Sequence, residues 1–259
     1  MIKKISKHAL LIIVLFLALF ARRQYFIHTV CEERGLFAHG GGYYEGYYCT
    51  NSLEAVGQSI RNHCKYIELD LLLTSDSIVV ASHDWATLNH QCSIESESAM
   101  TLGEFSSVLV HGCLHPMTWQ MIDSVFTSND SIVLVTDKIS SPDVIRNNFR
   151  KLKDRMLIET FTYDDYIQLD QDGYHPMISS VMPNKDILRL LLTYYGNNEP
   201  GIVVSMEGYE SRKAVMTLLS FIRPFYYALF AAKSTIESNK IFQSVPNAKF
   251  VYVDQLKDD

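Results

Sequence analysis

Several features that would indicate particular classes of protein are missing from this sequence. Its 259 residues include 23 Lys or Arg and 29 Asp or Glu, which gives a net charge of −6. A nucleic-acid partner would call for a basic patch, so this balance argues against one. We find no internal repeat, no low-complexity tract and no run of like charge, which argues against disorder beyond the ends. The length suits one large domain or two small ones with a substantial core.

A long apolar run is also missing, except near the N-terminus. The uncharged stretch from Ala9 to Ala21 has 13 residues, is preceded by lysines and is followed by Arg22 and Arg23. This length fits the apolar part of a signal peptide and is short for a membrane span. Residues 1–24 are therefore predicted to be a signal peptide or a membrane anchor, and residues 25–259 the functional domain. The two arginines and the lack of a small residue at the usual cleavage position favour the uncleaved anchor, with Lys3, Lys4 and Lys7 inside.

Either arrangement exports the domain to the cell envelope, as a membrane-anchored or a periplasmic or extracellular protein. A buried helix of a soluble protein is the remaining alternative for the apolar stretch. Export places the five cysteines in an oxidising compartment. None has CxxC spacing, which argues against a cysteine zinc site, and their odd number leaves at least one unpaired. We expect Cys92 and Cys113 to form a disulfide, because they flank a segment that looks like an excursion from the core.

The most informative stretch is an apolar run that carries two acids. Glu68 and Asp70 lie two residues apart within Tyr66–Leu73, so in a strand both side chains point to the same face. A near-continuous apolar run is typical of a strand that is buried on both faces, where two acids are costly unless they are neutralised. A divalent cation with oxygen ligands, Mg²⁺ or Ca²⁺, would neutralise them. A structural ion pair is the alternative.

A second segment, upstream, favours the cation. Leu36–Ala38 reads as a short strand that ends at His39, and three glycines follow it. Asn51 or Ser52 then begins a helix that leads to the acidic strand. This βαβ order places polar residues at the carboxyl ends of strands, where α/β folds carry their sites.

The rest of the chain alternates short apolar runs with amphipathic stretches, for example helices over 143–152 and 209–222. Eight strands alternating with helices predict a (β/α)₈ barrel, with an open doubly wound sheet as the alternative. Residues 85–115 fit this pattern least and are predicted to form an insertion on the site face. The predicted strands are Leu36–His39, Tyr66–Leu72, Ile132–Asp137, Met156–Phe161, Pro176–Val181, Gly201–Met206, Phe225–Ala231 and Lys249–Val253.

These motifs resemble those of the glycerophosphodiester phosphodiesterase family. The family opens its barrel with His-Arg-Gly, continues with a Glu-Asn-Thr helix start and a Glu-x-Asp strand, and has a His-Asp pair about fifteen residues on. The matching elements here are His39-Gly40-Gly41, Thr50-Asn51-Ser52, Glu68-Leu69-Asp70 and His83-Asp84. The resemblance is specific over about residues 36–138 and only topological beyond them.

The resemblance implies hydrolysis of a phosphodiester with one divalent cation, Mg²⁺ or Ca²⁺, and two histidines as general acid and base. Metal charge and proton transfer are what this reaction demands. By this resemblance Glu68 and Asp70 are metal ligands, and His39 and His83 are the acid–base pair, with their order left open. Substrate binding falls to Lys138, which would neutralise phosphate charge, with Asn51 and Trp85.

Two departures from the family pattern stand out. Gly40 follows the first histidine where the family has arginine, and Thr136 stands two before Lys138, where the family has its third metal carboxylate. Strict alternation points Asp137 away from the face of Lys138, but a bend at the strand end would bring it in. We expect Asp137 to be the third ligand, with Glu159 on the next strand as the other candidate. In that case the metal site is rebuilt around a different third carboxylate. The alternative is a site that has lost its third carboxylate and is weakened.

The expected function is therefore an exported phosphodiesterase at the membrane surface, acting on a glycerophosphodiester or a lysolipid-like substrate. The rival function is a non-catalytic or weakly active barrel that binds a phosphorylated ligand or an envelope partner.

Overall fold

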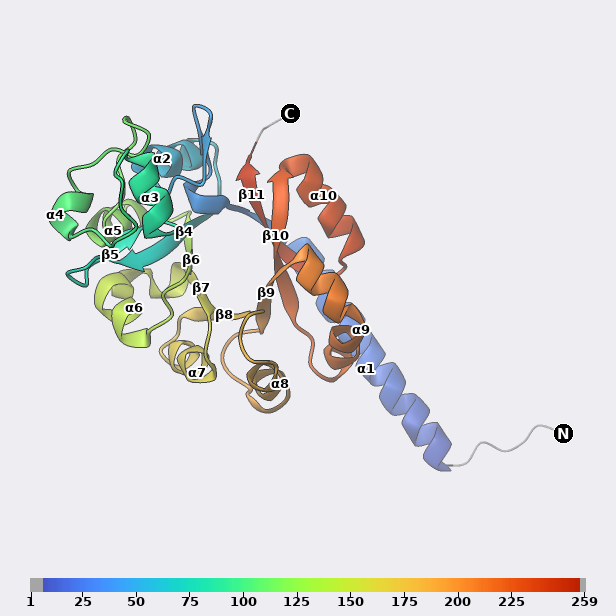
Figure 1. Ribbon diagram of the computed structural model, residues 1–259. Coiled ribbons are helices and arrows are strands. Elements are labelled where there is room, and N and C mark those ends of the chain that lie inside the picture. The colour runs from blue at the N-terminus through green and yellow to red at the C-terminus, as the bar shows by residue number, and fades with distance from the viewer. Residues whose placement is uncertain (1–6, 257–259) are drawn as a thin grey trace.

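The computed structural model describes residues 7–256, and it shows a closed barrel of parallel strands (Figure 1). The strand order is β1-β11-β10-β9-β8-β7-β6-β4, and β1 also pairs with β4, which closes the ring. The (β/α)₈ barrel is confirmed and the open sheet is excluded. The eight barrel strands are β1 (Gly35–Ala38), β4 (Tyr66–Leu73), β6 (Val133–Asp137), β7 (Met156–Thr160), β8 (His175–Ser179), β9 (Gly201–Ser205), β10 (Tyr226–Ser234) and β11 (Ala248–Gln255).

Three further strands and two short 3₁₀ helices decorate this ring. β5 (Val79–Ala81) pairs antiparallel with the end of β4, and β2 (Tyr43–Tyr44) forms a hairpin with β3 (Tyr47–Tyr48). The 3₁₀ segments are η1 (His39–Gly41) and η2 (Arg150–Arg155).

Helices cover the outside of the barrel. Several begin at a Ser or Thr whose side chain accepts a hydrogen bond from the first turn, as Ser52, Thr162, Ser205 and Ser234 do. Their apolar faces pack on the outward side chains of the strands and form the larger part of the core. These helices are α2 (Leu53–Arg61), α5 (Trp119–Thr127), α6 (Pro142–Phe149), α7 (Tyr163–Gln171), α8 (Asn184–Thr193), α9 (Met206–Ile222) and α10 (Thr235–Ser244). Two further helices, α3 (Trp85–Gln91) and α4 (Leu102–Phe105), pack on a separate apolar cluster.

The barrel interior is divided into an apolar and a polar layer. Inward side chains near the amino ends of the strands form one cluster that includes Phe37, Val135, Met177 and Phe250. Because side chains alternate along a strand, the inward positions beyond this cluster fall at the carboxyl ends. Those positions hold the buried polar residues Glu68, Asp70, Glu159 and Ser179, next to Tyr252 of the apolar cluster. The fold therefore places three buried carboxylates, Glu68, Asp70 and Glu159, at the carboxyl end of the barrel.

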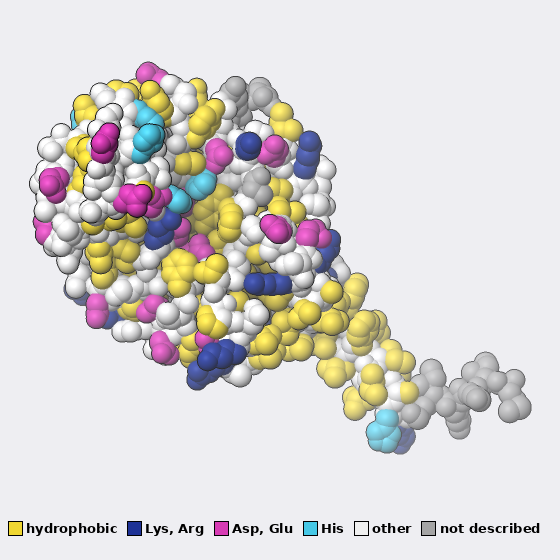
Figure 2. Space-filling model, in the orientation of Figure 1, with side chains coloured by type: hydrophobic (Ala, Val, Ile, Leu, Met, Phe, Trp, Pro, Cys, Tyr) yellow, Lys and Arg dark blue, Asp and Glu magenta, His cyan; other side chains and the backbone are white. Residues whose placement is uncertain are grey.

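The N-terminal helix α1 (Lys7–Glu32) protrudes from the barrel (Figure 1), and Figure 2 shows hydrophobic side chains along it. Leu11 and Ile12 are each 68% exposed. By length and composition this helix could cross a membrane, although a signal sequence meets the same criteria. It runs past residue 24 and reaches the amino end of β1. Lys3 and Lys4, predicted to flank the apolar stretch, lie outside the described residues.

Residues 85–115 lie between β5 and α5 and pack over their own small apolar cluster, which includes Leu88, Phe105 and Leu114. Cys92 and Cys113 are both free thiols, so the expected disulfide between them is wrong for this structure. The segment is held instead by this packing and by backbone hydrogen bonds such as His111 N to Gln91 O at 3.0 Å.

Candidate active site

Three carboxylates meet at the polar end of the barrel. One oxygen from each of Glu68, Asp70 and Asp137 lies within 4.8 Å of the others. β4 and β6 pair in parallel with Asp70 opposite Asp137, so these two side chains point to the same face, and Glu68 shares that face two residues earlier. Asp137, the expected third member of the group, is thus brought to the pair by strand register.

The same register turns position 136 away from the carboxylates. Thr136 pairs with Leu69, an outward residue of the core under the helices. A carboxylate at position 136 would therefore point away from the barrel interior. Lys138 follows with a left-handed backbone (φ 61°). This sharp turn lets adjacent residues, Asp137 and Lys138, both reach Asp70, whose Oδ1 lies 3.4 Å from Lys138 Nζ.

Burial and repulsion from neighbouring carboxylates raise the pKa of Glu68 and of Asp137. Burial raises the pKa of Glu68 well above its usual range, and the charge of Asp70 adds to the effect. Burial and the charges of Glu68 and Asp70 likewise raise the pKa of Asp137. Lys138 opposes these shifts, but one lysine does not balance three carboxylates.

The donor set fits a hard divalent cation. Asp137 Oδ1 and the hydroxyl of Tyr252 are both buried and have no hydrogen-bond partner among the described residues. Buried polar atoms are normally paired, so unpaired ones beside three crowded carboxylates indicate a missing partner. Carboxylate oxygens are the ligands that Mg²⁺ and Ca²⁺ prefer.

Two polar contacts hold the pair on β4. The backbone N–H of Gly40 donates to Glu68 Oε2 at 2.7 Å. The amide of Asn51 donates to Asp70 Oδ2 and accepts from the Asp70 backbone N–H, both at 2.9 Å. Asn51, expected to bind substrate, is buried and committed to Asp70 in this structure.

Glu159, the other candidate for the third ligand, lies on β7 and is nearly buried. Burial raises its pKa to about 7, against the lowering effects of a hydrogen bond with Ser179 and the charge of Lys138. The three-carboxylate group contains Asp137 in its place.

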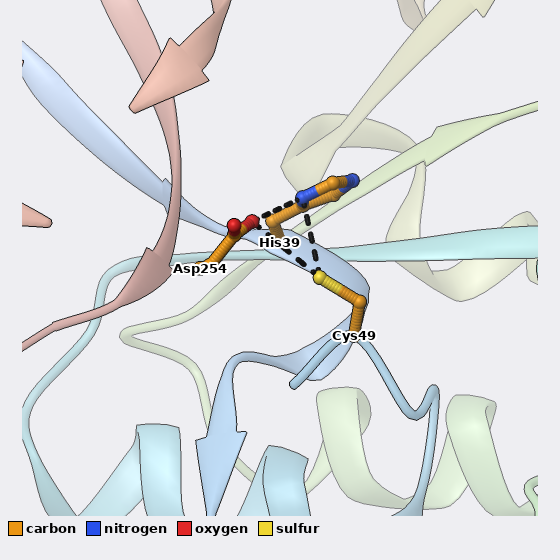
Figure 3. Close-up of side chains that lie close together, drawn as sticks. All are labelled: His39, Cys49 and Asp254. Carbon is orange, nitrogen blue, oxygen red and sulfur yellow. Dashed lines mark hydrogen bonds and ion pairs between the residues drawn. The ribbon is translucent and has the colours of Figure 1, made fainter. Parts of the chain in front are cut away.

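His39 lies at the end of β1 and contacts two side chains (Figure 3). Its Nδ1 is 2.7 Å from Asp254 Oδ1 and 3.3 Å from Cys49 Sγ. Burial by itself lowers the pKa of His39, but the hydrogen bonds to Asp254 and Cys49 outweigh it and raise the pKa to about 10. The ring of Tyr252 packs edge-on against the imidazole, with centroids 5.9 Å apart.

The backbone leaves no room for a side chain at Gly40. Its φ is +53°, and a Cβ there would lie 2.4 Å from the Cα of Cys49. The chain at Cys49 crosses directly over Gly40, so this position cannot hold a side chain in this backbone.

His83 reaches the same end of the barrel from β5. The preceding residue, Ser82, donates its backbone N–H to the carbonyl of Asp70 at 3.0 Å. His83 Nδ1 lies 2.6 Å from Asp84 Oδ2, and the imidazole is more than half exposed. Trp85 begins α3, is half-buried, and packs edge-on against Phe105.

A family model covers much of this site. The model of the glycerophosphoryl diester phosphodiesterase family matches residues 41–183, which is more than half of the chain. The chain belongs to this family. Its members are phosphoric diester hydrolases, as the motifs around Glu68 and His83 had indicated. A comparison with curated protein sequences finds no match.

Solved structures of glycerophosphodiester phosphodiesterases share the fold. The enzyme from Parabacteroides distasonis is 14% identical with a TM-score of 0.63, and the match covers 88% of each chain. The enzyme from Thermotoga maritima is 18% identical with a TM-score of 0.62, covering 86% of this chain and 95% of the other. One from Agrobacterium tumefaciens is 10% identical with a TM-score of 0.56, covering 85% and 95%.

Within this family member, sequence analysis missed two residues that contact His39. Asp254 and His39 both lie outside the residues that the family model matches. Asp254 directly follows the buried run Phe250–Val253 at the end of a barrel strand, the same signal that identified His39, and could have been found by it. Cys49 has no such signal, because it lies in a loop.

Proposed function

We propose that this family member hydrolyses a glycerophosphodiester-like substrate with the help of one Mg²⁺ or Ca²⁺ ion held by Glu68, Asp70 and Asp137. The observation that carries the proposal is the group of three carboxylates, Glu68 and Asp70 buried and Asp137 half-buried, with one oxygen from each within 4.8 Å of the others. When bound, such an ion offsets negative charge on the phosphoryl oxygens as the bond to the leaving group breaks.

Lys138 supports this electrostatic role. Its ammonium group lies at the edge of the carboxylate group, 3.4 Å from Asp70 Oδ1, and is partly exposed. A compact cation in this position can contact a phosphate oxygen of the bound substrate. Asn51 takes the role of positioning Asp70, while Trp85 remains a proposed substrate-binding residue.

The two histidines have different surroundings, which favours different roles. Nδ1 of His39 lies 2.7 Å from Asp254, and this partly buried carboxylate stabilises the imidazolium form. We therefore assign to His39 the general acid that donates its other ring proton to the leaving alkoxide. His83 is exposed and oriented by Asp84, and is suited to accept the proton of the attacking hydroxyl or water.

The exposed helix α1 supports the proposed anchor, with residues 25–259 as the domain that it exports. α1 joins the amino end of β1, whereas the site lies at the carboxyl ends of the strands (Figure 1). If α1 is embedded in a membrane, the site opens away from the region that this helix enters. This arrangement favours a water-soluble glycerophosphodiester over a lysolipid that stays in the bilayer.

An assay on the full chain in detergent tests the proposal. Hydrolysis of glycerophosphodiesters and of lysophospholipids is measured with Mg²⁺, with Ca²⁺ and after EDTA. We expect activity that requires the cation, falls sharply in His39→Ala and prefers the soluble substrates. Activity that survives both EDTA and His39→Ala would refute the mechanism. Binding of a phosphorylated ligand without any hydrolysis would favour the non-catalytic barrel.

A further inference from the structure

A second group of metal-binding side chains lies beside the carboxylates. His39, Cys49 and Asp254 each offer one ligand atom, and these three atoms all lie within 4.8 Å of one another (Figure 3). Asp254 Oδ1 lies 2.7 Å from His39 Nδ1 and 3.5 Å from Cys49 Sγ, and the sulfur lies 3.3 Å from Nδ1. In Figure 3 the three side chains converge: His39 comes from the end of β1, Cys49 from a loop and Asp254 from β11.

The chemistry of this group differs from that of the three carboxylates. Imidazole nitrogen, thiolate sulfur and carboxylate oxygen together suit Zn²⁺, whereas an all-oxygen set suits Mg²⁺ or Ca²⁺. Bonds of about 2.0 Å to nitrogen and oxygen and about 2.3 Å to sulfur, in a tetrahedron, place neighbouring ligand atoms about 3.3–3.6 Å apart. Both distances from the sulfur already agree with this spacing. Only the hydrogen-bonded His39–Asp254 pair, now at 2.7 Å, would need to open, by about 0.6 Å.

The backbone holds Cys49 in place for this role. Its own φ is +50°, in the left-handed region that residues other than glycine seldom adopt. Its N–H donates to Gly42 O at 3.2 Å, and the N–H of Asn51 donates to Gly40 O at 2.8 Å. Because Gly40 has no side chain, the chain at Cys49 can lie against it and bring the thiol to the imidazole.

We infer that His39, Cys49 and Asp254 form a second metal site, which takes Zn²⁺ or a similar thiophilic divalent ion in preference to Mg²⁺ and Ca²⁺. Binding forms one bond from the metal to each residue, and water completes the coordination. The thiol proton and the proton on His39 Nδ1 leave to solvent. The argument against zinc from the absence of CxxC spacing does not apply, because this site needs a single cysteine.

If His39 is the general acid, as in the proposed function, zinc bound at this second site inhibits hydrolysis. With its Nδ1 bound to the metal, His39 can no longer be the doubly protonated imidazolium that Asp254 stabilises. The Nε2–H that His39 would donate then belongs to a metal-bound neutral imidazole, a much weaker acid than an imidazolium, so zinc acts as an inhibitor while the carboxylates retain their own cation.

Cobalt spectroscopy tests the site without relying on activity. Co²⁺ replaces Zn²⁺ and gives an intense thiolate-to-cobalt charge-transfer band only when sulfur is a ligand. The full chain in detergent is titrated with Co²⁺ in the presence of excess Mg²⁺. We expect the band at one equivalent, its loss in Cys49→Ser and its retention in Cys113→Ser, whose thiol is exposed and free. No band in the unmodified chain, or an equal band in Cys49→Ser, would overturn the inference.

Zinc inhibition provides a second measurement, with each variant compared with its own activity in the absence of zinc. Losing an outer partner of a metal ligand weakens metal binding by about 10- to 100-fold, and losing a ligand costs at least as much. We expect the zinc concentration for half inhibition to rise at least tenfold in Cys49→Ser, and to stay unchanged in Cys113→Ser. Equal inhibition of both variants would place zinc elsewhere and overturn the inference. If the chain hydrolyses no substrate, the cobalt band still decides the site independently.

Discussion

Asp137→Asn removes one charge from the three-carboxylate group without changing the size of the side chain. Without metal, desolvation and then repulsion from Glu68 and Asp70 raise the pKa of the Asp137 carboxyl group. Its removal should therefore leave the metal-free protein at least as stable. The cost should appear only when the cation is added, because the variant has lost one of its oxygen ligands.

The size of the effect follows from linkage. A cation at 100 times its dissociation constant stabilises the folded protein by about 2.7 kcal/mol. For a chain of this size, that corresponds to a rise in Tm of roughly 5–11 °C. If the variant binds the cation about 10- to 100-fold more weakly, as losing even an outer partner of a ligand can cause, the stabilisation at the same concentration falls to about 0.4–1.4 kcal/mol.

Thermal unfolding in EDTA and in excess Mg²⁺ or Ca²⁺ measures both quantities. Thr136→Val is the matched control, because Thr136 is buried, has no described partner for its hydroxyl and pairs with the outward Leu69. The control should keep the full metal-induced rise in Tm. A full rise in Asp137→Asn, or a lost rise in Thr136→Val, would refute the assignment of the third ligand.

The same variant should change the pH dependence of stability in EDTA. The folded-state pKa values of Glu68 and Asp137 lie above their ordinary values of 4.5 and 3.8. The folded state therefore binds more protons than the unfolded state as pH rises above about 4, and the free energy of unfolding should fall with rising pH. Asp137→Asn should make that fall shallower.

Three further predictions concern neighbouring residues. Gly40→Ala should destabilise the protein more than Gly112→Ala in denaturant unfolding. A side chain at positive φ costs about 1–2 kcal/mol at either position, but only at Gly40 would the new Cβ also meet backbone, at 2.4 Å. Equal losses of stability would contradict the close approach at Gly40. Lys138→Met should lower kcat/KM on the order of 100-fold with little change in Tm, and an unchanged kcat/KM would exclude Lys138 from the phosphate contact. Hydrogen bonds, chiefly from the backbone of Thr87, lower the pKa of Asp84 to about 2. Asp84 therefore contributes stability above pH 3.8 that is lost as pH falls toward 2. Asp84→Asn should lack that contribution in acid unfolding, and a pH profile identical to that of the unmodified chain would contradict the prediction.

Much of the fold could be predicted because its signals are local. Each barrel strand is a short apolar run between polar stretches, and the predicted runs at residues 66–72 and 201–206 became β4 and β9 with boundaries within one residue. A strand buried on both faces needs apolar residues at nearly every position, so the pattern does not depend on distant contacts. Glu68, Asp70, His39 and His83 were identified for the same reason, since each interrupts or ends such a run.

Pairing across the chain is not local, and there the sequence left alternatives. The Cys92–Cys113 disulfide was inferred from position alone and is not formed, because nothing in a linear sequence reports whether two thiols come within bonding distance.

The sequence by itself determined that two acids of β4 would be buried at the carboxyl end of a barrel strand and would need a counter-charge. Only the tertiary structure decided which third acid joins them, because β4–β6 register sets Asp137, and not position 136, opposite Asp70. The same holds for His39: closure of the barrel brings Asp254 of β11, 215 positions along the chain, to its ring, and the tight loop over Gly40 adds Cys49. These contacts depend on strand register and ring closure, which arise from the packing of the whole barrel.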